Sequence, residues 1–162
     1  MTAAGEIREV EPLADPPDAV VVVPGSRSIT NRALVCAALA DGTSTLTGVL
    51  DSDDTQAMLG CLTSLGIAWR DLGAHVVEVD GCGGAIPPAP EGGGVIYTRL
   101  SGTTSRFVTA VCTLGEGEDT IDADGPMRAR PMGDLVEALR RLGVVVDAAA
   151  GRLPITVHAE GL

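Results

Sequence analysis

The stretch Val20–Leu50, VVVVPGSRSITNRALVCAALADGTSTLTGVL, contains the pattern that decides the fold. Its run of β-branched valines predicts a short strand over 20–23, and the apolar spacing of 28–40 predicts a helix. Alternating side chains predict a second strand over 43–50. A strand, a helix and a strand in this order are typical of α/β proteins.

The same order of elements occurs twice along the chain, as β-α-β-α-β-β. The predicted elements that complete the two copies lie at 53–65, 67–71 and 75–79, then at 95–98, 103–114, 119–123, 131–142, 144–147 and 155–158. Both copies place a Leu-x-x-Leu-Gly ending on their second helix, at 62–66 and 139–143. Such endings also arise by chance in leucine-rich helices with a glycine after the cap. A spacing of 77 residues between them favours two duplicated α/β units and not a solenoid of short repeats.

Further matches support the duplication. Arg32 and Arg106 are 74 residues apart, and Gly42 and Gly117 are 75 apart. The slow drift in spacing is what small loop insertions produce. We therefore predict a lead-in segment over 1–20, a first unit over 21–84 and a second unit over 85–162.

Composition excludes several classes of function. The 162 residues are 45% hydrophobic, which supplies a core, but only 2% aromatic, which disfavours a stacking surface for single-stranded nucleic acid. The net charge of −11 disfavours nucleic acids and anionic membranes as partners. With no apolar run long enough to span a bilayer and no leader after Met1, we expect a cytoplasmic protein.

The four cysteines stand apart in the sequence, at Cys36, Cys61, Cys82 and Cys112. They lack the paired CxxC spacing of a zinc site, so we expect buried free thiols in a reducing compartment and no bound metal. The chain contains no lysine, so all of its basic side chains other than histidine are arginines.

The turn PGSRSITNR, at 24–32, has the features of an anion site. Ser26 or Ser28 can cap the following helix and leave its first N–H groups pointing outward. Arg32 follows Ser28 by one helical turn and so lies on the same face, while Arg27 is expected in the loop. The alternative is an ordinary helix cap with two solvated arginines. It is not a P-loop, because GxxxxGK[ST] is absent.

Two further helix starts carry arginines. In RLSGTTSRF the turn spans 101–104, with Arg106 expected on the first helical turn; in MRARP, Arg128 and Arg130 precede Pro131, which is expected to be the first residue of the next helix. Three such starts in an acidic chain indicate a phosphorylated acidic small molecule as ligand. The alternative is that these arginines serve only solubility.

The stretches PGSRSITNRALVCAALADGTSTLTGVLDSDDTQAML, LSGTTSRF and DGPMRARPMGDLVEALRRLG closely resemble the start of the 5-enolpyruvylshikimate-3-phosphate synthases. The resemblance implies the enolpyruvyl transferase fold, with two domains of three β-α-β-α-β-β units each and substrates between the domains. It also implies transfer of the enolpyruvyl group of phosphoenolpyruvate to the 5-hydroxyl of shikimate 3-phosphate, with release of phosphate and without metal or organic cofactor.

Carried over position by position, the resemblance implies that Arg27, Ser28 and Arg32 bind shikimate 3-phosphate. It implies that Arg27, Gly102 and Arg130 bind phosphoenolpyruvate. Arg27 stands where the family has lysine, and the planar fork of an arginine is not equivalent to an ammonium. Arg99 and Leu100 stand where the family commonly has Gly and Asn or Leu, so Arg99 is expected to add bulk and charge near the site.

The sequence ends at Leu162, where the family continues into a third unit and a second domain that carries the acidic catalytic residues. We therefore expect a portion of the enzyme with no catalytic residue of its own, inactive alone. Its expected partners are the remainder of the enzyme, or a second copy through an exposed apolar face. Two alternatives are a stand-alone anion-binding or regulatory module, and a paralogous enolpyruvyl transferase with another acceptor. UDP-N-acetylglucosamine is disfavoured as acceptor, because the reactive-cysteine loop of that family has no match near Arg130.

Overall fold

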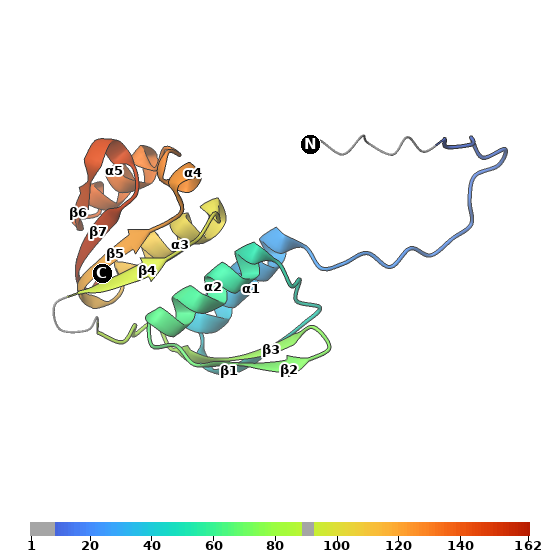
Figure 1. The fold of residues 1–162 in the computed structure, drawn as a ribbon. Helices are drawn as coiled ribbons and strands as arrows, with labels where there is room; N and C mark the ends of the chain where they lie inside the picture. The colour runs from blue at the N-terminus through green and yellow to red at the C-terminus, as the bar shows by residue number, and fades with distance from the viewer. Residues whose placement is uncertain (1–8, 89–92) are drawn as a thin grey trace.

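A computed structural model describes residues 9–88 and 93–162, which form two β-sheets with helices packed on them (Figure 1). In the first unit, helices α1 and α2 cover one face of a sheet with the antiparallel order β1-β3-β2. Its elements are α1 (Arg27–Leu39), β1 (Asp41–Thr47), α2 (Asp53–Ser64), β2 (Trp69–Gly73) and β3 (Val76–Cys82).

The second unit has a mixed sheet with the order β4-β5-β7-β6, in which β4 runs parallel to β5 and the other pairs are antiparallel. Its elements are β4 (Gly94–Tyr97), α3 (Gly102–Cys112), β5 (Glu116–Asp122), α4 (Gly125–Arg128), α5 (Gly133–Arg141), β6 (Val145–Ala148), the 3₁₀ turn η1 (Ala149–Gly151) and β7 (Ile155–Glu160). The α/β class expected from the sequence is confirmed.

The helix ends confirm the internal repeat at the level of single hydrogen bonds. Helices α2 and α5 are each followed by a glycine with positive φ, Gly66 at 73° and Gly143 at 95°. The amide after each glycine donates to the carbonyl of Leu62 or Leu139, at 2.9 and 3.1 Å. Each glycine amide also donates to the carbonyl three residues earlier, at 3.0 Å in both units. These paired bonds form the same Schellman ending, which glycine favours because it lacks a Cβ.

The predicted strand over 20–23 is wrong. These four valines are 73 to 96% exposed, and the segment runs out from the folded body (Figure 1). A β-branched run favours extended backbone, but a strand also needs a neighbour for its N–H and C=O groups. Gly94–Tyr97 has that neighbour in β5, whereas no strand of the described residues pairs with 20–23.

The core is aliphatic, as the low aromatic content requires. Its largest fully buried side chains come from both units and include Leu34, Met58, Leu62, Val79, Ile96, Val108, Ile121, Val136, Ile155 and Val157. Helix α1 approaches β3 so closely that a Cβ on Gly81 would lie 2.3 Å from the carbonyl oxygen of Ala40. Glycine at this position is therefore a packing requirement.

The cysteines differ from the expectation in two cases. All four are free, and Cys61 and Cys112 are buried, but Cys36 is exposed and Cys82 is half-buried. Cys36 lies in an apolar helical run, yet α1 turns Ala37 and Ala38 toward the core and leaves Cys36 facing outward. Burial raises the pKa of the Cys61 thiol to about 12, and burial together with nearby Asp119 also raises the pKa of Cys112.

We expect iodoacetamide at pH 8 to alkylate Cys36 in the folded protein and to leave Cys61 and Cys112 unmodified. The reagent attacks the thiolate, which burial disfavours at the two core positions. Peptide mass spectrometry after a timed reaction measures this difference, and the same reaction in guanidinium chloride provides the control in which every thiol reacts. Rapid alkylation of Cys61 without denaturant would show that the core between α2 and β4 is open.

Candidate functional site

Helix α1 begins at the turn that the sequence marks as an anion site. The Ser26 hydroxyl accepts a hydrogen bond from the Ile29 amide at 3.5 Å, so Ser26 and not Ser28 is the cap. Arg27 is consequently the first residue of the helix, and its predicted place in the loop is wrong. The start of α1 thus presents an arginine together with unshared backbone donors, a combination that suits an anion.

Arg32 joins α1 to α3. Its Nη1 donates to the Ser28 carbonyl at 2.9 Å, which confirms that Ser28 and Arg32 lie on one face of the helix. Its guanidinium carbon lies 5.8 Å from the centroid of the Phe107 ring, on α3. A cation held over an aromatic face keeps donors free for a ligand, because the ring occupies a face of the guanidinium and not its N–H edge.

Helix α3 begins in a similar way. The Ser101 hydroxyl accepts from the Thr104 amide at 3.2 Å, and the two hydroxyls are hydrogen-bonded at 2.7 Å. Arg106 follows the cap by five residues, on the second turn and not on the first as predicted. Its Nη1 donates to the Gly102 carbonyl at 2.9 Å, as Arg32 does to the carbonyl four residues before it.

The third basic cluster is arranged differently from the prediction. Pro131 is not the first residue of a helix, because α5 begins two residues later, at Gly133. The Met132 amide donates to the Gly151 carbonyl at 2.8 Å, and the Met132 carbonyl accepts the first helical bond from Val136. Arg128 instead ends the single turn α4, and Arg130 lies between α4 and α5.

A cavity of about 480 Å³ lies where these helix starts meet. The structure brings to it four of the five predicted site residues, and Ser28 contributes only through its contact with Arg32. The lining residues are Arg27, Arg32, Asp54, Leu100, Gly102, Thr103, Arg106, Phe107 and Arg130. Four arginines face one carboxylate here, so the cavity is locally basic in a chain of net charge −11.

Among the described residues, Asp54 is the one carboxylate that lines this cavity. It lies in the first turn of α2 and pairs with Arg27, with 2.9 Å between Oδ2 and Nη1. An adjoining hollow of about 370 Å³ shares both residues and also touches Ser52 and Ser101, the caps of α2 and α3. An anion that enters near Arg27 must therefore compete with Asp54.

Gly102 lies at a crowded point of the cavity wall. A Cβ there would lie 3.0 Å from Nη1 of Arg106 and 3.1 Å from Nη1 of Arg130. Both contacts are with the ends of flexible side chains, so a larger residue would displace the two guanidinium groups without forcing the backbone apart. The absence of a side chain at Gly102 thus sets the positions of both cations.

Sequence reasoning missed Asp54 and Phe107 as parts of the site. In the sequence, Asp54 has the features of an acidic residue at a helix N-terminus, and Phe107 has those of a core aromatic residue. No local pattern therefore indicates that either residue lines the site. In contrast, Arg99 was expected near the site but does not line either hollow, whereas Leu100 lines both. Arg99 instead lies close enough to Cys61 for its charge to oppose the rise in that thiol's pKa.

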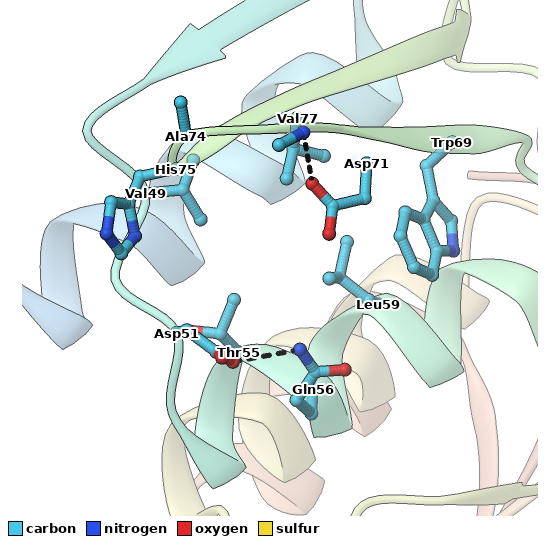
Figure 2. Close-up of a pocket in the computed structure, with 11 residues that line it drawn as sticks. Val49, Asp51, Thr55, Gln56, Leu59, Trp69, Asp71, Ala74, His75 and Val77 are labelled. Carbon is cyan, nitrogen blue, oxygen red and sulfur yellow. Dashed lines mark hydrogen bonds between the residues drawn. The ribbon is translucent and has the colours of Figure 1, made fainter.

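A separate hollow of about 320 Å³ lies between α2 and the β2–β3 turn (Figure 2). Its described lining contains the carboxylates of Asp51 and Asp71, the ring of His75 and no arginine. Asp51 accepts from Gln56 at 3.0 Å, and Asp71 accepts from the Gly73 amide at 2.8 Å. This hollow lacks the charge to hold a phosphorylated acid.

Residues 9–88 and 93–162 lack two other features, a metal site and a membrane-spanning helix. No group of three or more His, Cys, Asp or Glu side chains there is arranged to hold a metal ion. No helix in the same ranges has the length and apolar character needed to cross a bilayer.

Known proteins resemble this chain in sequence and in fold. The family model of EPSP synthase, 3-phosphoshikimate 1-carboxyvinyltransferase, matches residues 14–162. The chain belongs to the EPSP synthase family. Among curated members of that family, the enzyme of Rhizobium etli is 46% identical over 139 residues and that of Shewanella baltica 46% over 143. These alignments cover 85% and 86% of this chain but 32% and 33% of the relatives, so the chain spans about a third of their length.

Two solved structures show the same fold. The EPSP synthase of Acinetobacter baumannii aligns with a TM-score of 0.75 at 24% identity, over 86% of this chain and 32% of that one. An enolpyruvyl transferase from Streptomyces tendae aligns with a TM-score of 0.55 at 16% identity, over 82% and 29%. The enolpyruvyl transferase fold predicted from the sequence is thereby confirmed.

Proposed function

We propose that this chain forms part of the substrate site of an enzyme that transfers the enolpyruvyl group of phosphoenolpyruvate to the 5-hydroxyl of shikimate 3-phosphate. The observation that carries the proposal is the convergence of four arginines and the starts of two helices, α1 and α3, on one cavity. Both substrates carry a phosphate and a carboxylate. Guanidinium forks and helix N–H groups are the protein groups that bind such anions best.

Within the cavity, the proposed shikimate 3-phosphate residues are Arg27, Ser28 and Arg32. The proposed phosphoenolpyruvate residues are Arg27, Gly102 and Arg130. The family resemblance suggests this division, and the geometry supports it, since Arg27 and Arg32 lie on α1 and Arg130 lies against Gly102 at the start of α3. Arg27 lines both hollows and is suited to touch both substrates.

The proposal assigns no acid or base catalyst to this chain. Asp54 lines the cavity, but it is paired with Arg27. We propose that the units at 21–84 and 85–162, with the lead-in at 1–20, act in the cytoplasm together with the remainder of the enzyme. In its absence, we propose self-association through apolar surface that the remainder would cover.

Titration calorimetry of the chain with shikimate 3-phosphate tests the proposal. We expect weak binding that weakens further when NaCl rises from 50 to 300 mM, because exposed charges are screened over shorter distances at higher salt. A parallel assay of phosphate release from phosphoenolpyruvate with shikimate 3-phosphate should give no turnover. Measurable turnover by the purified chain would refute the proposal that the catalytic groups lie outside it. Absence of shikimate 3-phosphate binding at low salt would refute the proposed binding site.

A second candidate is an enolpyruvyl transferase with a different acceptor. The observation that favours it is the ion pair between Arg27 and Asp54, a residue of α2. Arg27 stands where the family has lysine, and the pair draws its guanidinium toward α2. If Arg27 has retuned the site, Arg27→Lys should bind shikimate 3-phosphate about tenfold more tightly. Unchanged affinity in that variant would leave shikimate 3-phosphate as the acceptor.

Replacement of Gly102 by alanine should weaken phosphoenolpyruvate binding about tenfold while changing stability by less than about 1 kcal/mol. The added methyl group displaces the ends of Arg106 and Arg130, and glycine is not required at Gly102 by a positive φ. Calorimetry measures the affinity and thermal unfolding the stability. The matched control is Gly133→Ala, also at the first residue of a helix, where a Cβ meets nothing within 4 Å. Equal affinities in the two variants would contradict the crowding argument.

A further inference from the structure

Arg130 lines the cavity from the loop between α4 and α5. Its side chain has no hydrogen bond or ion pair within the described part of the chain, although its Nη1 lies 3.1 Å from the Cβ position of Gly102. The Arg130 amide donates to the Met127 carbonyl at 3.0 Å. The direction of the side chain therefore depends on how firmly the turn α4 and the residues after it are anchored.

An ion pair fastens α4 to the end of β5. Asp122 is the last residue of β5, and its Oδ1 accepts from Nε of Arg128 at 2.7 Å while Oδ2 accepts from Nη2. Oδ1 also accepts from the Ala123 amide at 2.8 Å. The hydrogen bonds from Arg128 lower the pKa of Asp122, so this carboxylate is charged at neutral pH.

The other anchors of α4 lie on different sides of the turn. Met127 is 1% exposed, and the Asp124 amide donates to the Arg99 carbonyl at 3.0 Å. Within the turn, the Met127 and Arg128 amides donate to the Asp124 carbonyl at 2.8 and 3.0 Å. Past Arg130, the Pro131 carbonyl accepts from Nη2 of Arg106 at 2.9 Å. A helix of four residues is not stable alone, so these contacts decide its position.

We propose that the Asp122–Arg128 ion pair positions Arg130 for its anionic ligand. Neither Asp122 nor Arg128 lines the cavity, so both act through the backbone of α4 and not by contact with the ligand. A bidentate arginine–carboxylate pair fixes direction as well as distance, which suits this role. The inference rests on the proposed function, because phosphoenolpyruvate is the ligand proposed for Arg130.

The first test is a double-mutant cycle in which phosphoenolpyruvate is the probe. Its affinity for the full 162-residue chain is measured by NMR titration. We expect Arg128→Gln and Asp122→Asn each to weaken binding about fivefold, and the double variant to be no weaker than either. Arg128→Lys should recover part of the loss. The matched control is Glu137→Gln, which removes an exposed carboxylate–arginine pair on α5 and should leave affinity unchanged.

The second test needs no ligand. Amide hydrogen exchange at Met127, Arg128 and Arg130 should rise about tenfold in Arg128→Gln, while exchange at the sheet residues Ile121 and Val157 stays as in the wild type. Unchanged exchange in α4 would overturn the positioning role. Loss of affinity in Arg128→Gln but not in Asp122→Asn would also overturn it, since Arg128 would then be a ligand itself. If the wild type fails to bind phosphoenolpyruvate, the proposed function fails, and the exchange result alone decides the role of the pair.

Discussion

Arg32→Ala is expected to abolish measurable binding of shikimate 3-phosphate by this chain. Within the described part of the chain, the Arg32 side chain has two such contacts, with the Ser28 carbonyl and the Phe107 ring, so most of its donors are free for an anion. Hydrogen bonds between charged groups contribute about 1.5 to 3 kcal/mol each, so the loss of two corresponds to at least about 100-fold in affinity. For a ligand that already binds weakly, this removes the heat signal.

The fold should survive that substitution. Arg32 loses an exposed cation–π contact, about 0.5 to 1 kcal/mol, and a solvent-exposed hydrogen bond, about 0.5 to 1.5 kcal/mol. The sum, about 1 to 2.5 kcal/mol, is small beside the stability of a folded domain. Arg141→Ala is the matched control, because Arg141 is also an exposed helical arginine, 78% exposed and paired with Glu137. Binding that persists in Arg32→Ala, at the affinity of the Arg141→Ala control, would remove the main assignment of the site.

Gly81→Ala is expected to destabilise the folded protein by about 3 kcal/mol. A methyl group there would lie 2.3 Å from the Ala40 carbonyl oxygen and 2.5 Å from the Ala37 carbonyl oxygen, and both are backbone atoms at the end of α1. Relief requires the helix to move away from β3, which carries core residues of the first unit. The melting temperature should fall by roughly 6 to 12 °C.

Gly60→Ala provides the opposite expectation. Gly60 lies inside α2, where a Cβ meets nothing within 4 Å, so alanine should stabilise the protein by about 0.5 to 1 kcal/mol. Chemical denaturation of both variants separates a packing effect from a general effect of adding a methyl group. Equal stabilities for Gly81→Ala and the wild type would show that α1 does not pack against β3 as described.

Much of the fold could be predicted because the signals are local. Each helix cap and each glycine after a helix forms hydrogen bonds within about four residues along the chain. A repeated sequence pattern therefore produces repeated hydrogen bonds, as at the caps Ser26, Ser52 and Ser101 and at the glycines after α2 and α5. The predictions that were wrong depended on distant contacts. Among the described residues, Val20–Val23 has no partner strand, and the start of α5 is shifted by the bond from Met132 to Gly151.

The candidate site divides in the same way. Spacing along one helix sufficed to place Arg32 on the face of Ser28, and the resemblance named Gly102 and Arg130. Neither the spacing nor the resemblance revealed that Asp54 pairs with Arg27, 27 residues away, or that Phe107 on α3 contacts Arg32. Those contacts join different helices, so no local sequence pattern predicts them.

By itself, the sequence determined the α/β class, the matching glycine endings of α2 and α5, and the arginines near the starts of α1 and α3. These follow from side-chain periodicity, capping and turn chemistry, which act over a few residues. Only the tertiary structure decided that four arginines share one cavity with Asp54, that Gly102 sets the space between two of them, and that the Asp122–Arg128 pair fastens α4. The physical reason is that each of these depends on close packing between segments far apart in the chain.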